Sequence, residues 1–434
     1  MVLLQAKKAY EAALKLAEVS SKDKDRALKA IAAAISKNKN AILKANARDV
    51  KAAEKKKIPQ ALIQRLKLND SKIQEMVRMV GSVAAMDDPV GVTLSTVELD
   101  KGLELYKVSC PIGVIGVVFE SRPDALVQIS SLCLKSSNAV ILKGGKEARE
   151  SNKTLFNIVA KAAGTAGIPN GWIQLIEARE QVMKLLKLDE YVDLVIPRGS
   201  NEFVKYVQEN TRIPVLGHAD GVCHVYVDAK ADISKALNIS FGAKVQYPAV
   251  CNAVETLLVN EKISKKFLPK IADKYSEAGV EMRVCRRAAK ILNGYNVKSA
   301  TEKDWKTEYL DKIISIKVVP DVKDAIKHIN TYGSKHTDAI ITEDNKTAVK
   351  FMRGVDSSSV MWNASTRFSD GYRYGLGAEV GISTNKLHAR GPTGLDGLVS
   401  YRYYLIGNGQ VVGDYVGPKA KKFKHTKISK QWKG

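Results

Sequence analysis

The spacing of apolar residues predicts helices at the start of the chain and alternating strands and helices in most of the rest. Up to about residue 85, apolar side chains recur every three or four positions and so mark one face of each helix. The first such face is formed by Ala6, Tyr10, Ala13, Leu14 and Ala17. These helices show no candidate chemistry.

Two β-prone regions follow a different pattern. Residues 93–108 alternate about Asp100-Lys-Gly102, a turn sequence typical of hairpins. Residues 398–404 and 410–416 form a second pair near the other end of the chain. The two regions could join in a sheet that makes an oligomer, or in an edge sheet within one chain, and the sequence favours neither.

Between these regions, strands and helices alternate. Strands are expected at residues 112–119, 139–142, 172–176 and 192–196, with helices between them and a short strand at 213–216. This order predicts a parallel, doubly wound sheet that binds ligands at the carboxyl ends of its strands. The alternation resumes after residue 251, with strands at 256–259, 313–319, 338–342 and 359–362. The fold class is therefore α/β, with two doubly wound domains.

The predicted division of the chain has four parts. They are a first α/β domain with the N-terminal helices (1–92 and 109–245), a second α/β domain (246–395), a β-hairpin and oligomerisation element (93–108 and 396–417) and a basic tail (418–434) that is loosely ordered at its end.

Composition narrows the classes of protein. In 434 residues no apolar run reaches the roughly 20 residues of a membrane span, and the N-terminal stretch lacks a secretory signal. Five cysteines show neither CxxC nor metal-ligand spacing, so we expect a reducing cytoplasm and no metal. Lys and Arg exceed Asp and Glu by 69 − 46 = 23. Because the lysines are dispersed and no nucleic-acid module accompanies them, we interpret this charge as a solvated surface and expect no nucleic acid partner.

The most informative stretch for chemistry runs from Tyr247 to Val259. It places Cys251 where a loop enters an apolar, β-prone segment. A thiol held there suits covalent acyl chemistry, because a thiolate attacks carbonyl carbon well. The alternative is a small core residue, since free cysteines are often buried.

Two strand ends carry glycines and cations suited to phosphate. Lys143-Gly-Gly-Lys146 and Arg198-Gly-Ser200 each stand where a strand gives way to a helix, so that backbone N–H groups and positive charge can meet an anion. For each motif the alternative is an ordinary turn at the start of a helix. Two such motifs on one sheet favour a dinucleotide-binding site. The standard GxGxxG and GxxxxGK[ST] fingerprints are absent. We interpret the glycines of residues 375–381 as a turn lining the active site.

Arg122 and Arg367 are further candidates. Arg122 follows the first parallel strand and could bind a phosphate or carboxylate with its guanidinium fork, or form an ion pair with Asp124 or Glu120. The same choice applies to Arg367. His218, alone in a loop, is more often structural than catalytic.

A single cysteine between two α/β domains, after a phosphate-binding sheet, resembles the aldehyde dehydrogenase superfamily. Longer motifs resemble its γ-glutamyl phosphate reductase family over essentially the whole chain. The motifs are Phe119-Glu-Ser-Arg-Pro-Asp-Ala-Leu, Leu142-Lys-Gly-Gly-Lys-Glu-Ala148, Pro197-Arg-Gly-Ser200, Cys251-Asn-Ala-Val-Glu-Thr256, Asn363-Ala-Ser-Thr-Arg-Phe, Gly375-Leu-Gly-Ala-Glu-Val-Gly-Ile-Ser and His388-Ala-Arg-Gly-Pro-Thr-Gly-Leu.

This resemblance implies the NADPH-dependent reductive dephosphorylation of L-glutamate 5-phosphate to glutamate 5-semialdehyde, the second step of proline synthesis from glutamate. It makes the first domain NADP-binding and the second catalytic. Cys251 would be the nucleophile that displaces phosphate and forms a thioester. Oxidising relatives place a glutamate base in a Glu-Leu-Gly-Gly motif, where this chain has His218-Ala-Asp-Gly221. A reductive enzyme needs no water-activating base, so this departure fits.

The resemblance also assigns residues. For the cofactor they are Lys143 near the adenosine ribose, Lys146 toward the 2′-phosphate of NADP, Arg198, Gly199 and Ser200 at the pyrophosphate, and Glu308 at the nicotinamide ribose. For the substrate they are Arg122, which would bind the acyl phosphate or the developing oxyanion, with Asn252, Asn363 and Arg367. The lability of an acyl phosphate implies a glutamate 5-kinase partner in a separate chain, and we expect a homo-oligomer, either a dimer or a tetramer.

Overall fold

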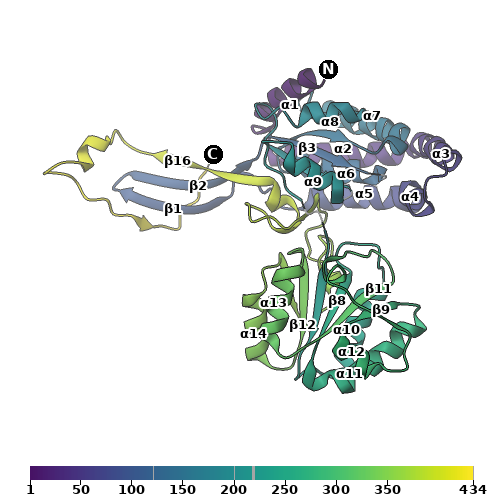
Figure 1. Cartoon of the computed structure of the whole chain (residues 1–434). Helices are drawn as coiled ribbons and strands as arrows, with labels where there is room; N and C mark the ends of the chain where they lie inside the picture. Colours follow the sequence, from purple (N-terminus) through teal and green to yellow (C-terminus); the bar gives the residue numbers. More distant parts are fainter. Residues whose placement is uncertain (121, 200, 218–219, 434) are drawn as a thin grey trace.

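Parallel sheets form the centres of two α/β domains, and a long antiparallel arm projects from the first of them (Figure 1). The computed structural model describes residues 1–120, 122–199, 201–217 and 220–433. Ser200, a predicted cofactor residue, and His218 lie outside the described residues.

The first domain is built on the sheet order β5-β4-β3-β6, with all neighbours parallel. Its strands are β3 (Val114–Phe119), β4 (Ala139–Lys143), β5 (Ile173–Leu175) and β6 (Leu194–Arg198). Its helices are α1 (Val2–Leu16), α2 (Ser21–Lys37), α3 (Lys39–Lys55), α4 (Gln60–Leu66), α5 (Asp70–Ala85), α6 (Pro123–Lys135), α7 (Arg149–Thr165), α8 (Arg179–Leu185) and α9 (Asn201–Glu209). In the sheet, β4 lies on one side of β3, and β6, which comes later in the chain, lies on the other side. The crevice of such a sheet therefore opens at the carboxyl ends of β3 and β6.

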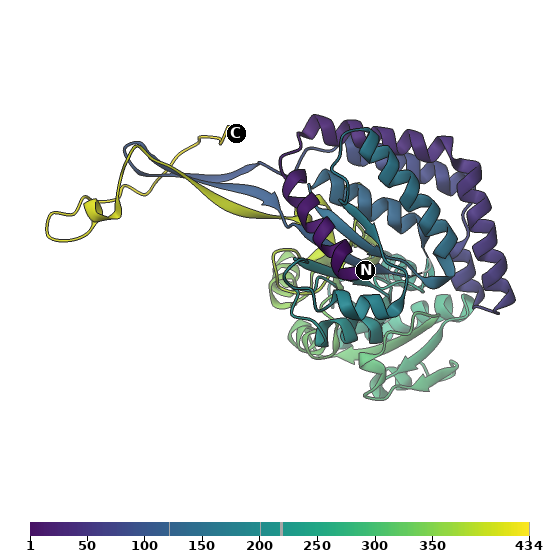
Figure 2. The same ribbon diagram turned by 90° about the horizontal axis from the view of Figure 1, so that it is seen from above.

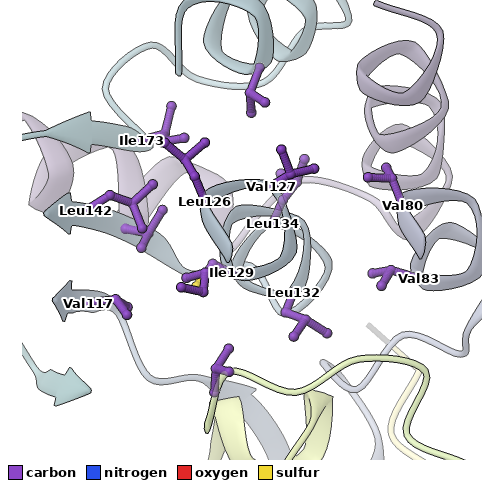
Figure 3. Packing of buried hydrophobic residues seen from close by; sticks show 14 of the residues in the cluster. Val80, Val83, Val117, Leu126, Val127, Ile129, Leu132, Leu134, Leu142 and Ile173 are labelled. Atoms are coloured by element: carbon purple, nitrogen blue, oxygen red, sulfur yellow. The ribbon is translucent and has the colours of Figure 1, made fainter. Parts of the chain in front are cut away.

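Helix α6 links this sheet to the N-terminal helices. Pro123 opens the helix, and nearly all of its residues are buried, as in a helix that is apolar on every side. Its side chains lie between Val117 and Leu142 of the sheet and Val80 and Val83 of α5 (Figure 3). Arg122 is the N-cap residue of this helix, so the position of Arg122 follows from the packing of α6. The N-terminal helices wrap around this domain (Figure 2).

The second domain is built on a larger parallel sheet in the order β10-β9-β11-β8-β7-β12-β13. Its strands are β7 (Cys223–Val227), β8 (Val254–Asn260), β9 (Glu281–Val284), β10 (Val297–Ser299), β11 (Ile313–Val319), β12 (Thr337–Ile341) and β13 (Ser359–Trp362). Its helices are α10 (Ile233–Val245), α11 (Glu261–Glu277), α12 (Arg286–Ile291), α13 (Val322–Tyr332) and α14 (Asn345–Gly354). Every residue of β7 and β8 is buried.

The domain boundary differs from the predicted one. The sequence placed it at 245, but β7 and α10 belong to the second domain, so the boundary falls before Cys223. β7 is easily missed because His224 interrupts its apolar run, and this buried histidine pairs with buried Asp338 at 2.9 Å. A later part of the predicted second domain returns to the first: β14 (Gly381–Ser383), β15 (Gly391–Thr393) and their flanks join its core through Val380 and Leu398.

The arm is an antiparallel sheet in the order β16-β2-β1-β17, extended well away from both domains (Figures 1 and 2). Its strands are β1 (Thr93–Asp100), β2 (Leu103–Pro111), β16 (Val399–Ile406) and β17 (Thr426–Lys427). β16 pairs with β2, so the two β regions from opposite ends of the chain join in one sheet. The strand predicted at 410–416 is wrong: that segment contains a 3₁₀ turn (Val412–Tyr415).

The tail predicted to be loosely ordered lies along the arm. Thr426 and Lys427 pair with β1, and Trp432 packs against Tyr106 and Tyr404. The basic composition suggested disorder, but these aromatic contacts and the β1 edge order the segment. In the described part of the chain, no helix combines the length and apolarity needed to cross a membrane.

Candidate active site

Cys251 lies at the amino ends of β7 and β8, partly exposed. The Cys223 thiol at the start of β7 donates to the Cys251 carbonyl oxygen at 3.1 Å. On the next residue, the Asn252 carbonyl oxygen accepts from Thr366 Oγ1 at 2.7 Å, and its side-chain amide donates to the Ser369 carbonyl at 2.8 Å. The loop carrying the thiol is therefore fixed by two strands and by the segment after β13.

Gly221 passes directly against this loop. A Cβ atom at that position would lie 2.2 Å from the Cys251 carbonyl oxygen and 2.6 Å from Glu308 Oε1, so no side chain fits. Asp220, beside it, is engaged elsewhere: its carboxylate accepts from Asn201 Nδ2 at 2.5 Å and pairs with Lys205 at 3.3 Å. Gly221 thus serves close packing, and Asp220 contacts α9.

Arg198 is a residue of the first domain that interacts electrostatically with Cys251. It ends β6, and its Nη1 atom is buried without a hydrogen-bond partner among the described residues. Burial, followed by the charge of Arg122, lowers the pKa of this guanidinium. The negative charges of Glu379 and Cys251 oppose the shift. Arg198, predicted for the cofactor, therefore lies within electrostatic reach of the thiol and of the predicted substrate arginine.

Arg122 stands beside Arg198. Its Nη2 atom lies 2.8 Å from Asp124 Oδ2, the structural pair that the sequence left open. Burial tends to lower the pKa of Arg122, but Asp124 and then Glu379 raise it above its usual value. Its side chain remains 49% exposed, so the ion pair leaves part of the guanidinium accessible to an anion.

Arg367 approaches from the other side. It lies in the 3₁₀ turn Thr366–Phe368, and its Nε donates to Gln246 Oε1 at 3.1 Å. Burial and then Arg373 lower its pKa, whereas the negative charge of Cys251 raises it. Arg198 and Arg367, one from each domain, therefore both lie within electrostatic reach of Cys251, an arrangement that sequence reasoning missed because these arginines lie far apart in the chain.

Glu379 was not predicted as a site residue, although its glycine-rich stretch was expected to line the site. Its Oε2 accepts from the Gly371 N–H at 2.8 Å. Burial raises the pKa of this carboxyl, and Arg198 opposes the shift. The signal in the sequence was a lone acid within Gly375-Leu-Gly-Ala-Glu379.

Asn363 is not brought to the thiol. Its Oδ1 accepts from the Thr342 N–H at 3.0 Å and its Nδ2 donates to the Thr342 carbonyl at 3.0 Å. Thr342 follows the carboxyl end of β12, whereas Cys251 lies at the amino ends of the same parallel sheet. With φ of 53°, Asn363 turns the chain back after β13, which suits asparagine in the left-handed region. Its contacts thus give it a structural role instead of the predicted substrate contact.

A cradle lies at the end of β4. A cavity of about 270 Å³ is lined by Gly144, Gly145, Lys146, Arg149, Asn152, Leu175, Ile176, Glu177 and Ala178. A Cβ at Gly144 would lie 2.1 Å from Asn152 Nδ2, and one at Gly145 would lie 2.0 Å from Glu147 Oε1. Lys143, beside it, has a pKa lowered mainly by burial. Close backbone, a cavity and cations fit a phosphorylated nucleotide.

Glu308 joins the two domains. It lies between β10 and β11, and its Oε2 accepts from Asn201 Nδ2 of α9 at 3.1 Å. Gly199, at the start of that helix, approaches Glu120 so closely that a Cβ would lie 3.0 Å from Glu120 Oε1. These contacts place Glu308 and Gly199 along the crevice between the cradle and Cys251. Among the residues described, no group of three or more His, Cys, Asp or Glu side chains could hold a metal ion.

Comparisons with known proteins agree with this geometry. The model of the aldehyde dehydrogenase family matches residues 2–286. A γ-glutamyl phosphate reductase from Methanosarcina barkeri is 58% identical over 98% of this chain and 96% of its own length. One from Pelotomaculum thermopropionicum is 56% identical over 98% of both chains. The crystal structure of γ-glutamyl phosphate reductase from Thermotoga maritima has a TM-score of 0.92 and 42% identity, covering 94% of this chain and 99% of that one. The chain therefore belongs to the aldehyde dehydrogenase family of oxidoreductases and, within it, to the γ-glutamyl phosphate reductases.

Proposed function

We propose that this chain catalyses the NADPH-dependent reductive dephosphorylation of L-glutamate 5-phosphate to L-glutamate 5-semialdehyde and phosphate, the second step of proline synthesis from glutamate. The observation that carries the proposal is that Arg198 of the first domain and Arg367 on the other side both lie within electrostatic reach of Cys251. A nucleophilic thiol flanked by guanidinium groups suits a substrate that bears both a phosphate and a carboxylate.

The first chemical step belongs to Cys251. Its thiolate attacks the acyl carbon, a C–S bond forms, the C–O bond to phosphate breaks, and phosphate leaves with the electron pair. Arg122 and Arg198 lie together on the first domain's side, so we assign them to the leaving phosphate. Arg367 lies on the other side, and we assign it to the substrate's α-carboxylate. Asn252, pinned by Ser369, holds the loop in place.

The cofactor's place follows from the cradle. Lys143 and Lys146 with Gly144 and Gly145 would hold the adenosine end of NADPH, Gly199 its pyrophosphate and Glu308 its nicotinamide ribose. When bound, NADPH supplies hydride to the thioester carbon. Collapse of the resulting thiohemiacetal returns the thiolate of Cys251 and frees the aldehyde.

Release by water is disfavoured by the local contacts. An oxidising aldehyde dehydrogenase needs a carboxylate that activates water against the thioester. Asp220, in the corresponding stretch, is engaged by Asn201 and Lys205. This arrangement supports reduction as the direction of the reaction.

The partners and the compartment are part of the proposal. We propose a cytoplasmic homo-oligomer assembled through the arm, and a separate glutamate 5-kinase that hands over the labile acyl phosphate. The arm supports the first part, since β16 is an edge strand with exposed Tyr401, Tyr403 and Leu405.

The reverse reaction tests the proposal. Wild type should reduce NADP⁺ in the presence of pyrroline-5-carboxylate, the cyclised aldehyde, only when phosphate is added. Cys251→Ala should lose this turnover while still binding NADPH. Turnover that ignores phosphate, or that survives in Cys251→Ala, would exclude the proposed reaction.

A further inference from the structure

A buried ion pair lies next to the catalytic loop, in α10 and β8. Lys244 of α10 and Glu255 of β8 are both fully buried, and Lys244 Nζ lies 2.6 Å from Glu255 Oε2. Burial raises the pKa of Glu255 above its usual range although Lys244 opposes the shift. Burying two charges gains little stability over an apolar core of the same volume. The presence of the Lys244–Glu255 ion pair therefore calls for a role other than stability.

The second oxygen of Glu255 has a different partner. Oε1 accepts from the Leu310 N–H at 3.2 Å. Leu310 has φ of 53°, in the left-handed region that a leucine side chain rarely adopts. Its side chain is 44% exposed, so packing of that side chain does not account for the conformation. The hydrogen bond from the Leu310 N–H to Glu255 is a contact that can hold the backbone of residue 310 in this conformation.

Tyr309 is held in the same way. Its hydroxyl lies 2.9 Å from Asp304 Oδ1 and 2.7 Å from Ser315 Oγ. The Arg283 guanidinium lies 5.0 Å and Lys244 Nζ 5.9 Å from its ring centroid, which suits cation–π contacts. Lys244 thus contacts both the acid that holds residue 310 and the ring of residue 309.

These two residues directly follow Glu308. The Glu308 carboxylate stands between α9 and the backbone beside Cys251, 3.1 Å from Asn201 Nδ2 and against Gly221. Turning the backbone at 309–310 would swing the carboxylate out of this position. We propose that Lys244 and Glu255 are positioning residues, which fix the 308–310 segment so that Glu308 is set for the nicotinamide end of the cofactor. This inference rests on the proposed function, because it takes Glu308 as a cofactor ligand.

Matched double variants isolate the bond to Leu310. Lys244→Met with Glu255→Gln removes both charges and keeps an acceptor for the Leu310 N–H. Lys244→Met with Glu255→Leu removes the same charges and the acceptor. Affinity for NADPH is measured by the fluorescence of its reduced nicotinamide. Thermal unfolding and the rate at which iodoacetamide alkylates Cys251 report on the fold and on the catalytic loop.

We expect the leucine variant to bind NADPH about tenfold more weakly than the glutamine variant, with similar unfolding temperatures and alkylation rates, as the loss of one hydrogen bond to a positioned group predicts. Equal NADPH affinities in the two variants would overturn the inference. If the leucine variant does not fold, Glu255→Gln alone serves. Lys244 and the Leu310 N–H face different oxygens of the carboxylate, and the retained Lys244 charge favours the amide oxygen over the NH₂ group, so the NH₂ group is left facing the Leu310 N–H. The NADPH affinity of this single variant should then fall, and an unchanged affinity would overturn the inference. Wild type that does not bind NADPH at all would instead contradict the proposed function.

Discussion

Arg198 and Arg122 show how two residues of the first domain can serve a thiol of the second. Each ends or follows a strand of the first sheet, and these strands are adjacent, so their carboxyl ends deliver two guanidinium groups to one place. Two cations held together in a partly buried site repel each other. Asp124 and Glu379 offset part of that repulsion, and a bound phosphate would offset more.

Arg122→Leu tests this assignment. We expect kcat/KM for glutamate 5-phosphate to fall about 100-fold or more, because a charge-assisted contact to the leaving phosphate is lost. NADPH affinity should stay within about twofold, since the cradle lies at the end of another strand. Arg353→Leu, an exposed arginine in the last turn of α14, is the matched control. Unchanged kinetics in Arg122→Leu would remove Arg122 from the site.

Lys146 lines the cradle, and its charge should select the cofactor. Lys146→Glu is expected to shift the ratio of NADPH to NADH affinity toward NADH by about tenfold or more, because a carboxylate repels a 2′-phosphate. Lys153→Glu, a change at an exposed residue of α7 that does not line the cavity, should leave the ratio as it is. Fluorescence titration with both cofactors measures the ratio, and an unaltered ratio in Lys146→Glu would refute the role.

At residue scale, sequence reasoning could single out positions where a motif and a strand end coincide, as for Cys251, Lys143 and Arg122. It went wrong for Asn363, whose motif also serves a turn: the left-handed backbone at this position uses the amide for local contacts to Thr342. Glu379, Gly221 and the Lys244–Glu255 pair depend on contacts between segments that are distant in the chain or lie within the core. No local pattern in the sequence predicts these contacts.

At the scale of elements, the buried histidine of α13 gives a pH dependence of stability. His328 is 4% exposed, and burial, aided by the neighbouring His224 and Lys317, lowers its pKa well below the usual value. In the unfolded chain the imidazole takes up a proton below about pH 6.5, whereas in the folded chain it stays neutral. The unfolded state then binds more protons, so stability is lost as the pH falls through this value.

We therefore expect the free energy of unfolding to fall by about 1.4 kcal/mol per pH unit from this residue alone once the pH is below 6.5. Urea unfolding at pH 7.5 and pH 5.5 measures the change. His328→Gln, which keeps an acceptor for Lys317, should show a smaller loss over the same interval than wild type. Identical losses in the two proteins would contradict this explanation.

Elements with a clean apolar period, such as β3, β8 and α6, could be predicted from the sequence because each is buried along its length. β7 could not, since its buried His224 is paired with Asp338 of β12, a partner 114 residues away. The basic tail was misjudged for a similar reason, because its order comes from β1 and from aromatic side chains of β2 and β16.

At the scale of the whole molecule, the proposed chemistry belongs to the crevice between the domains and the proposed oligomer contact belongs to the arm. The amino ends of the second sheet meet the carboxyl ends of the first, and Glu308 and Arg198 cross between them. The arm stands away from this crevice (Figure 1) and ends in an edge strand, β16. Its exposed aromatic and aliphatic side chains suit pairing with a second copy of the chain.

A triple variant tests the role of the arm. Tyr401→Lys, Tyr403→Lys and Leu405→Lys should place like charges along the β16 edge and lower the molar mass seen by light scattering, because charged residues block edge pairing. Val412→Lys, an exposed change at the tip outside the strand, should leave the molar mass unchanged. An unaltered mass in the triple variant would place the oligomer interface elsewhere.

The central claim is that Cys251 carries the acyl group. Mass spectrometry of the intact protein and of its proteolytic peptides tests it. The protein is first incubated without NADPH with glutamate 5-phosphate, made in place by a glutamate 5-kinase, glutamate and ATP, and is then quenched in acid. The account predicts a mass gain of one glutamyl group on the peptide that contains Cys251, lost on addition of NADPH and absent in Cys251→Ala. No adduct in wild type, or the same adduct in Cys251→Ala, would contradict it.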